Sequence, residues 1–301
     1  MPRPSSLSRA QTQIAAWFNE AGPSAYTEQE LANILREKRH SWSLAASVRL
    51  ADFVKFLERS TDMRVFRFKV EAYDRKADRY VWGTRSPYLI ALSLKARSYL
   101  SHGTAARLHN LLKQKRGPLY LNVEQSPKPP PTGGLSQDSI NRAFSREQRQ
   151  SNYIFKCGAL AVTMLSGKHT EQLAVEKMQG EHGEHLDVTN LERTLIDITV
   201  RPSYAGGIDN VVSAYKLARG RLSVDKMFTI LNQLSYSYPY HQSIGFLMEV
   251  AGYANADLQK AREYPFEFDF HLVHGSKENL YSEAWRIFYP SRIKVRRRSN
   301  F

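Results

Sequence analysis

The chain has 301 residues with 43 Lys and Arg against 29 Asp and Glu, which gives a formal charge of +14 and a pI of about 9.8. A hydrophobic fraction of 42% is enough for packed cores, and no apolar run approaches the ~20 residues that a membrane-spanning helix needs. The single cysteine excludes a disulfide framework and the N-terminus lacks the apolar segment of a secretory signal, so we expect a cytoplasmic protein of two domains.

The N-terminal region predicts three helices in succession. Residues 8–21 repeat apolar side chains at helical spacing, and Gly22 is suited to end that helix. Thr27 and Glu30 have the spacing of a capping box, which opens a second helix. A third helix is predicted to begin near residues 41–43, and its inward-facing side chains are then expected to be Leu44, Val48, Ala51, Val54 and Leu57.

A β-hairpin is predicted after the helices. Residues 63–73 alternate apolar and charged side chains, a polar stretch at 74–78 interrupts the pattern, and residues 79–83 resume it. Three helices and a hairpin are the components of a winged helix-turn-helix, in which the third helix enters the major groove of DNA. The sequence therefore predicts such a domain at residues 1–85.

The pattern changes after residue 85. We predict strands at 86–94, 118–125 and 265–273, one long or two short strands at 153–165, and helices at 101–112, 136–150, 186–198, 208–219 and 243–253. The Pro-rich stretch 128–134 is predicted to be a loop, because proline cannot donate to a sheet ladder. The expected fold class is α+β, with a mixed α/β domain at 86–293 after the winged helix and a basic tail at 294–301.

The cationic residues near the predicted third helix and the hairpin tip are the main candidate site. Helix N-termini attract phosphate, and side chains of this kind make most contacts to the DNA backbone. The residues predicted to bind DNA are Lys38, Arg39, His40, Ser41, Ser43, Ser47, Arg49, Arg75, Lys76 and Arg79. Two alternatives stay open, an ordinary solvated surface and a protein-interaction module whose basic face meets an acidic partner.

Three other groups of residues have side chains that could bind a metal ion or act in catalysis, and each also has a simpler structural interpretation. His182 and His185 lie among acidic residues, but their spacing of three differs from the i, i+4 spacing of zinc proteases. Cys157 lies in an apolar run and is predicted to be buried. Glu267 and Asp269 alternate along a predicted strand and could hold the metal ion of a nuclease, although two acids on a solvent face explain them as well. We expect no enzymatic activity and no cofactor.

The predicted helix at 186–198 has an ordinary explanation for its charged residues. Thr189 or Asn190 can cap its N-terminus. Arg193 and Asp197 have i, i+4 spacing, which predicts a surface ion pair worth about 0.2–0.5 kcal/mol.

Two longer stretches carry a recognisable pattern. They are VTNLERTLIDITVRPSYAGGIDNVVSAY and SPYLIALSLKARSYLSHGTAARLHNLL, and the matching residues of the second are Tyr99, Ser101, His102, Ala105, Ala106 and His109. The chain resembles, over roughly residues 8–290, the AbiEi family, the antitoxins of type IV abortive-infection toxin–antitoxin systems. The resemblance implies a winged helix that binds inverted repeats of its own promoter and represses the operon, an α/β antitoxin domain, and a partner toxin of nucleotidyltransferase fold. A palindromic operator would bring two copies together on double-stranded DNA.

Overall fold

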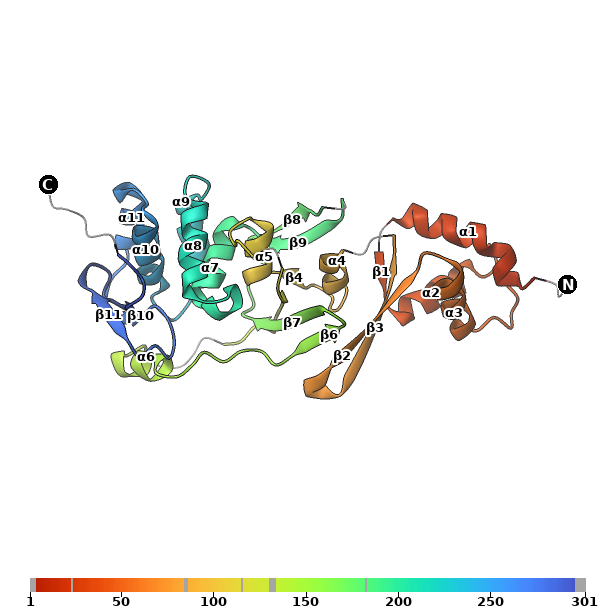
Figure 1. Cartoon of the computed structure of the whole chain (residues 1–301), viewed down its shortest axis with the longest axis horizontal. Coiled ribbons are helices and arrows are strands. Elements are labelled where there is room, and N and C mark those ends of the chain that lie inside the picture. Colours follow the sequence, from red (N-terminus) through yellow and green to blue (C-terminus); the bar gives the residue numbers. More distant parts are fainter. Residues whose placement is uncertain are drawn as a thin grey trace. The chain divides into compact units, whose positions relative to one another are not determined.

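The structure is a computed structural model with a mixed arrangement of helices and strands (Figure 1). It describes residues 4–22, 24–83, 86–114, 116–129, 134–181 and 183–295. The chain forms two compact units, and each contains several separate stretches. Unit 1 contains Met1–Ser98, Asn152–Met164 and Lys177–Asp187, and unit 2 contains Tyr99–Ser151, Leu165–Glu176 and Val188–Phe301. The predicted boundary at residue 85, part of the Pro-rich loop and the basic tail from residue 296 lie outside the described residues.

Unit 1 begins with three helices and an antiparallel sheet. The helices are α1 (Ser6–Ala21), α2 (Glu28–Lys38) and α3 (Leu50–Ser60), and the strands are β1 (Ser24–Tyr26), β2 (Arg64–Val70) and β3 (Arg75–Trp82). Strand β3 lies between β1 and β2, and β6 (Ile154–Cys157) pairs with the other edge of β2. The three helices and β3 share one apolar core, whose buried residues include Ile14, Phe18, Leu31, Phe53 and Trp82.

The predicted end of the first helix and start of the second are confirmed. Gly22 follows α1 with a φ of 77°, a left-handed value that glycine adopts without strain. The Thr27 hydroxyl accepts from the Glu30 amide at 3.2 Å, and the Thr27 amide donates to the Glu30 carboxylate at 2.7 Å. This reciprocal capping box satisfies backbone donors that would otherwise lack a partner in the first turn of α2.

The predicted third helix is wrong in its start and at one residue of its inward face. Helix α3 begins at Leu50, and Ser43 has a φ of 51°, which no helix continues. Of the residues predicted to face inward, Leu44 and Leu57 are buried and Val48 and Val54 pack against the apolar core. Ala51 is exposed, and Phe53 is buried in its place.

The predicted hairpin is present, but its turn is displaced. Strand β3 starts at Arg75, whereas the polar stretch 74–78 was predicted to be the turn. The chain reverses through a short 3-10 helix, Glu71–Tyr73, and Asp74 closes the turn with a φ of 44°. The strands already pair at Val70 and Arg75. The hairpin therefore includes a polar segment whose composition is typical of a loop.

The predicted strand at 86–94 is wrong, because Pro87–Leu92 forms helix α4. The Ser86 hydroxyl accepts from the Leu89 amide at 3.4 Å, and Pro87 occupies the first helical position. A serine cap followed by proline is a helix-start signal that the apolar composition of this stretch obscured.

Unit 2 is built mainly from helices that pack around α7. Its helices are α5 (His102–Leu108), α6 (Gln137–Phe144), α7 (Leu191–Val200), α8 (Ile208–Ala218), α9 (Val224–Leu234), α10 (Tyr240–Ala251) and α11 (Asn255–Arg262). Strands β4 (Tyr99–Leu100) and β5 (Leu119–Glu124) pair with each other, and β4 also pairs in parallel with β9 (His185–Thr189). A second sheet has the order β10-β12-β11, from Phe270–His271, Ile287–Pro290 and Asn279–Ser282. No helix among the described residues has both the length and the apolar character to cross a membrane.

Most predicted elements after residue 100 are confirmed in type, including stretch 153–165, which forms two strands, β6 and β7 (Leu160–Gly167). Three elements are corrected. Helix 136–150 stops at Phe144, helix 186–198 begins as strand β9, and strand 265–273 shrinks to Phe270–His271. Helices α9 and α11 and strand β8 (Val175–Gln179) were not predicted.

Candidate functional site

The residues predicted to bind DNA all lie in unit 1, but only some of them lie where the sequence placed them. Ser41, Ser43 and Ser47 are exposed in the segment that joins α2 to α3, so none of them is on the third helix. The Ser41 hydroxyl donates to the carbonyl of Lys38 at 3.0 Å. Arg49 is exposed and caps the N-terminus of α3.

Arg39 shapes the segment before α3. Its Nη1 donates to the carbonyl of Ala45 at 2.7 Å, and its Nη2 donates to the carbonyl of Val48 at 2.8 Å. In a helix that began at residue 43, these two carbonyls would accept hydrogen bonds from backbone amides. Here the segment is a turn, and the Arg39 guanidinium donates to them in place of those amides. A phosphate contact by Arg39 would therefore compete with the hydrogen bonds that hold this segment.

Arg79 lies within strand β3 and not at the hairpin tip. Its Nε and Nη2 donate to the carbonyls of Ser93 and Leu94 at 2.9 and 3.1 Å. Burial lowers the pKa of Arg79 from its usual value, against the attraction of Glu30 and Asp78. The predicted position beside the turn is thus wrong, and the guanidinium ties α4 and the residues after it to the sheet.

Exposed cations on α3 were missed as candidates. Lys55 and Arg59 are exposed on the same helix that Arg49 caps, and neither has a carboxylate within ion-pair distance among the described residues. Together we call Arg49, Lys55 and Arg59 the α3 cations. The sequence prediction did not include Lys55 and Arg59, because it placed the N-terminus of this helix near Ser41 and Ser43, several residues too early.

Three lysines lie side by side across neighbouring strands of unit 1. Lys69 of β2 is directly opposite Lys76 of β3 and directly opposite Lys156 of β6. All three side chains are exposed, and directly opposed residues point to the same face of a sheet. We call Lys69, Lys76 and Lys156 the lysine row. Like charges directly opposite one another destabilise strand pairing, so the lysine row does not stabilise the sheet.

The groups considered for metal chemistry have other partners where the structure describes them. Asp269 accepts from Arg286 Nε and from the Tyr281 hydroxyl, each at 2.8 Å. His182 lies outside the described residues, and Asp187 forms an ion pair with Lys177 at 2.7 Å. Over the described ranges, no three His, Cys, Asp or Glu side chains are grouped to hold a metal ion. Cys157 is a free thiol of intermediate exposure, which corrects the buried position expected for it.

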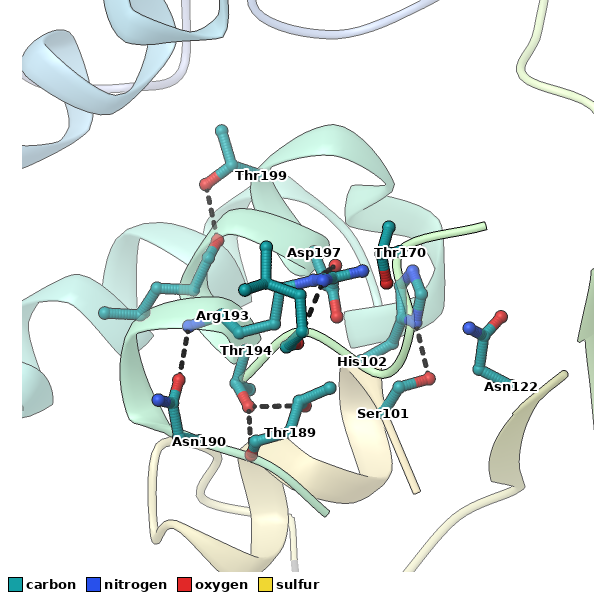
Figure 2. A network of polar contacts seen from close by, with 12 residues as sticks. Ser101, His102, Asn122, Thr170, Thr189, Asn190, Arg193, Thr194, Asp197 and Thr199 are labelled. Atoms are coloured by element: carbon teal, nitrogen blue, oxygen red, sulfur yellow. Dashed lines mark hydrogen bonds and ion pairs between the residues drawn. The ribbon is translucent and has the colours of Figure 1, made fainter. Parts of the chain in front are cut away.

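The ion pair of α7 is buried, which corrects the surface pair expected from its spacing. Arg193 Nε donates to Asp197 Oδ1 at 2.8 Å, and the side chains are only 6% and 5% exposed. Figure 2 shows this pair amid a hydrogen-bonded network that includes the Asn190 cap and the Thr189–Thr194 hydroxyl pair. Burial by itself lowers the pKa of Arg193, but the Asp197 carboxylate, Tyr236 and Tyr99 together outweigh burial and raise it.

The residues that carry the family resemblance are also part of this interior. The Ser101 hydroxyl and His102 Nδ1 lie 2.9 Å apart (Figure 2), and burial lowers the pKa of His102 to about 4, so the ring is neutral at pH 7. His109 Nε2 donates to the carbonyl of Thr189 at 2.7 Å. The Tyr99 hydroxyl accepts from Asn122 and donates to Glu124. Each group is satisfied by a protein partner, so the network holds α5, β5 and α7 together.

Comparison with known proteins adds information on the fold. No protein-family model matches the chain, and no curated protein does. The crystal structure of the RV2827C protein from Mycobacterium tuberculosis is similar, with a TM-score of 0.58 and 13% sequence identity. The similarity covers 96% of this chain and 92% of that chain, so the two share a fold over nearly their whole lengths.

Proposed function

We propose that unit 1 is a winged helix-turn-helix that binds double-stranded DNA, with α3 as the recognition helix and the β2–β3 hairpin as the wing. The order α1-β1-α2-α3-β2-β3, with β3 between the other two strands, supports this assignment. In domains of this type the third helix enters the major groove.

The α3 cations are the observation on which the proposal rests. Lys55 and Arg59 are one helical turn apart, and Arg49 lies at the N-terminus of the same helix, where unpaired amides also favour phosphate. The lysine row adds positive charge on the adjoining hairpin. Lysine and arginine side chains that neutralise phosphates release condensed counterions, which supplies most of the affinity of such proteins for DNA.

We propose further that this DNA binding represses the chain's own operon and that unit 2 acts as an antitoxin. This part rests on the resemblance to the AbiEi family, which implies inverted repeats as the operator and a nucleotidyltransferase-fold toxin as partner. The proposed role requires no catalysis by this chain.

Fluorescence anisotropy with a labelled duplex from the region upstream of the gene tests the proposal. Replacing Lys55 and Arg59 together by glutamate should weaken binding by at least about 100-fold and reduce the slope of log K against log salt by about 2. Lys216→Glu, an exposed lysine on α8 of unit 2, is the control and should leave binding within about twofold.

Equal binding by the double variant and the control would exclude α3 as the DNA-binding element. The antitoxin role is tested in cells that express the product of the adjacent gene. If that product is toxic and the full chain fails to suppress its toxicity, the antitoxin assignment is wrong, whatever the DNA-binding result.

A further inference from the structure

Unit 2 contains a hollow of about 500 Å³ that four arginines line together. Arg142 is near the C-terminal end of α6, Arg146 and Arg149 lie in the segment that follows, and Arg201 caps the C-terminus of α7. Folding thus brings guanidinium groups from two separate parts of the chain to one concave surface. Its volume is within the range of small-molecule sites in proteins.

The positive charge of this hollow is almost uncompensated. Glu147 is the one acidic residue among its lining residues, and within the described residues none of the four guanidiniums has a carboxylate at ion-pair distance. Arg201 is held in place, because its Nη1 donates to the carbonyl of Arg149 at 3.0 Å and its guanidinium lies 5.9 Å from the centre of the Tyr204 ring. Like charges gathered in a concave site repel one another and concentrate anions from solution.

Flat aromatic rings line the same hollow. Tyr238 and His274 are among its lining residues, and the His274 ring stacks on Phe144 with centroids 3.9 Å apart. His274 Nδ1 also lies 3.1 Å from the carbonyl of Ala143, which fixes the ring. Burial, with a contribution from Arg201, lowers the pKa of His274, so a neutral ring borders the arginines at pH 7.

A second hollow of about 410 Å³ shares Glu147, Gln148 and His274 with the first. Ser203 lines it, and the Ser203 hydroxyl is buried with no hydrogen-bond partner in the described part of the chain. A buried hydroxyl without a protein partner costs stability, and a polar ligand or an ordered water beside it would satisfy it.

We propose that the arginine-lined hollow binds the phosphate group of a nucleotide, with the base against Tyr238 and His274. Guanidinium groups match phosphate oxygens with two parallel hydrogen bonds, and aromatic side chains stack on bases. The same chemistry is offered by a free nucleotide and by the phosphorylated end of a nucleic-acid strand. The site is separate from the α3 cations and does not depend on the DNA binding proposed for unit 1.

Isothermal titration calorimetry on the full chain tests the site with pyrophosphate, the four common nucleoside triphosphates, the matching unphosphorylated nucleosides, and a short single-stranded oligonucleotide with and without a terminal phosphate. The test variant is Arg142→Gln with Arg146→Gln, because both side chains are exposed and neither donates a side-chain hydrogen bond in the described structure. Arg116→Gln, an exposed arginine of unit 2 outside the hollow, is the matched control.

We expect the wild-type chain and the control to bind at least one phosphorylated probe, and the double variant to bind it at least about 30-fold more weakly. Binding of free triphosphates identifies the ligand as a nucleotide, whereas binding confined to the phosphorylated oligonucleotide identifies a strand end. The proposal is wrong if no phosphorylated probe binds at millimolar concentration, if unphosphorylated probes bind equally well, or if the double variant matches the control. Unfolding curves of the variants, which should superimpose on the wild-type curve, separate loss of the site from loss of the fold.

Discussion

Two ion pairs with similar geometry lie in very different surroundings in the two units. In unit 1, Arg67 and Glu58 are 3.1 Å apart with side chains 63% and 30% exposed. In unit 2, Arg193 and Asp197 are 2.8 Å apart with side chains 6% and 5% exposed. An exposed pair gains little because water and salt screen it, whereas a buried charge without its partner is costly. The exposed Arg67–Glu58 pair is therefore available to a ligand, whereas the buried pair of α7 serves the fold.

Removing one partner of each pair gives the largest expected difference between the two regions. Asp197→Ala should lower the free energy of unfolding of unit 2 by about 3–5 kcal/mol, because it leaves the Arg193 guanidinium buried and unpaired. Glu58→Ala should cost no more than about 1 kcal/mol. Urea unfolding followed by circular dichroism measures both.

A double replacement sharpens this result. Arg193→Met with Asp197→Leu removes both charges and should destabilise less than Asp197→Ala alone, because no buried charge remains without a partner. If Asp197→Ala lowers the free energy of unfolding by less than about 1 kcal/mol, the Arg193–Asp197 pair is not desolvated. The two ion pairs would then not differ in their contribution to stability.

The buried His102 of unit 2 predicts that the stability of the folded chain depends on pH. Burial lowers the pKa of His102 to about 4 in the folded chain, from 6.5. As the pH falls below 6.5 the unfolded chain takes up this proton first, so stability is present at neutral pH and is lost progressively down to pH 4. The loss from this residue amounts to about 3 kcal/mol at most.

The measurement is the free energy of unfolding at several pH values between 7 and 4.5 for His102→Asn and for His40→Asn. Asparagine tolerates the left-handed φ of 48° at position 102, so the first variant removes the titrating group with little backbone strain. His102→Asn should flatten the pH profile, although His241, whose pKa burial also lowers to about 4, retains part of the slope. An unchanged slope would mean that His102 titrates normally in the folded chain.

The smallest expected difference in stability is between variants of two arginines near the end of α2, Arg39 and Arg36. Arg39→Ala removes hydrogen bonds to the carbonyls of Ala45 and Val48 and should cost about 1–3 kcal/mol in unit 1. Arg36 is exposed, and within the described residues its one side-chain hydrogen bond is to the neighbouring Asn33 side chain, so Arg36→Ala should cost less than about 0.5 kcal/mol. Comparable thermal unfolding of the two variants would show that Arg39 does not hold the segment before α3.

The elements that could be predicted from the sequence are those with a local signal. Gly22 and the Thr27–Glu30 box gave helix boundaries because capping involves residues that are adjacent along the chain. Local patterns failed at residues 74–78, because pairing with β2 extends strand β3 through a stretch whose polar composition is typical of a turn. They failed at Pro87–Leu92 for a different reason, since an apolar run is compatible with a buried strand and with a buried helix.

The sequence by itself determined the charge, the mixed helix and strand content, and most helices with a clear cap, because these depend on composition and on contacts a few residues apart. Only the tertiary structure decided which charged residues are exposed. Spacing made Arg193 and Asp197 a surface pair, and the packing of unit 2 around α7 enclosed them. The convergence of Arg142, Arg146, Arg149 and Arg201 on one hollow likewise depends on contacts between segments far apart in the chain, which no local pattern encodes.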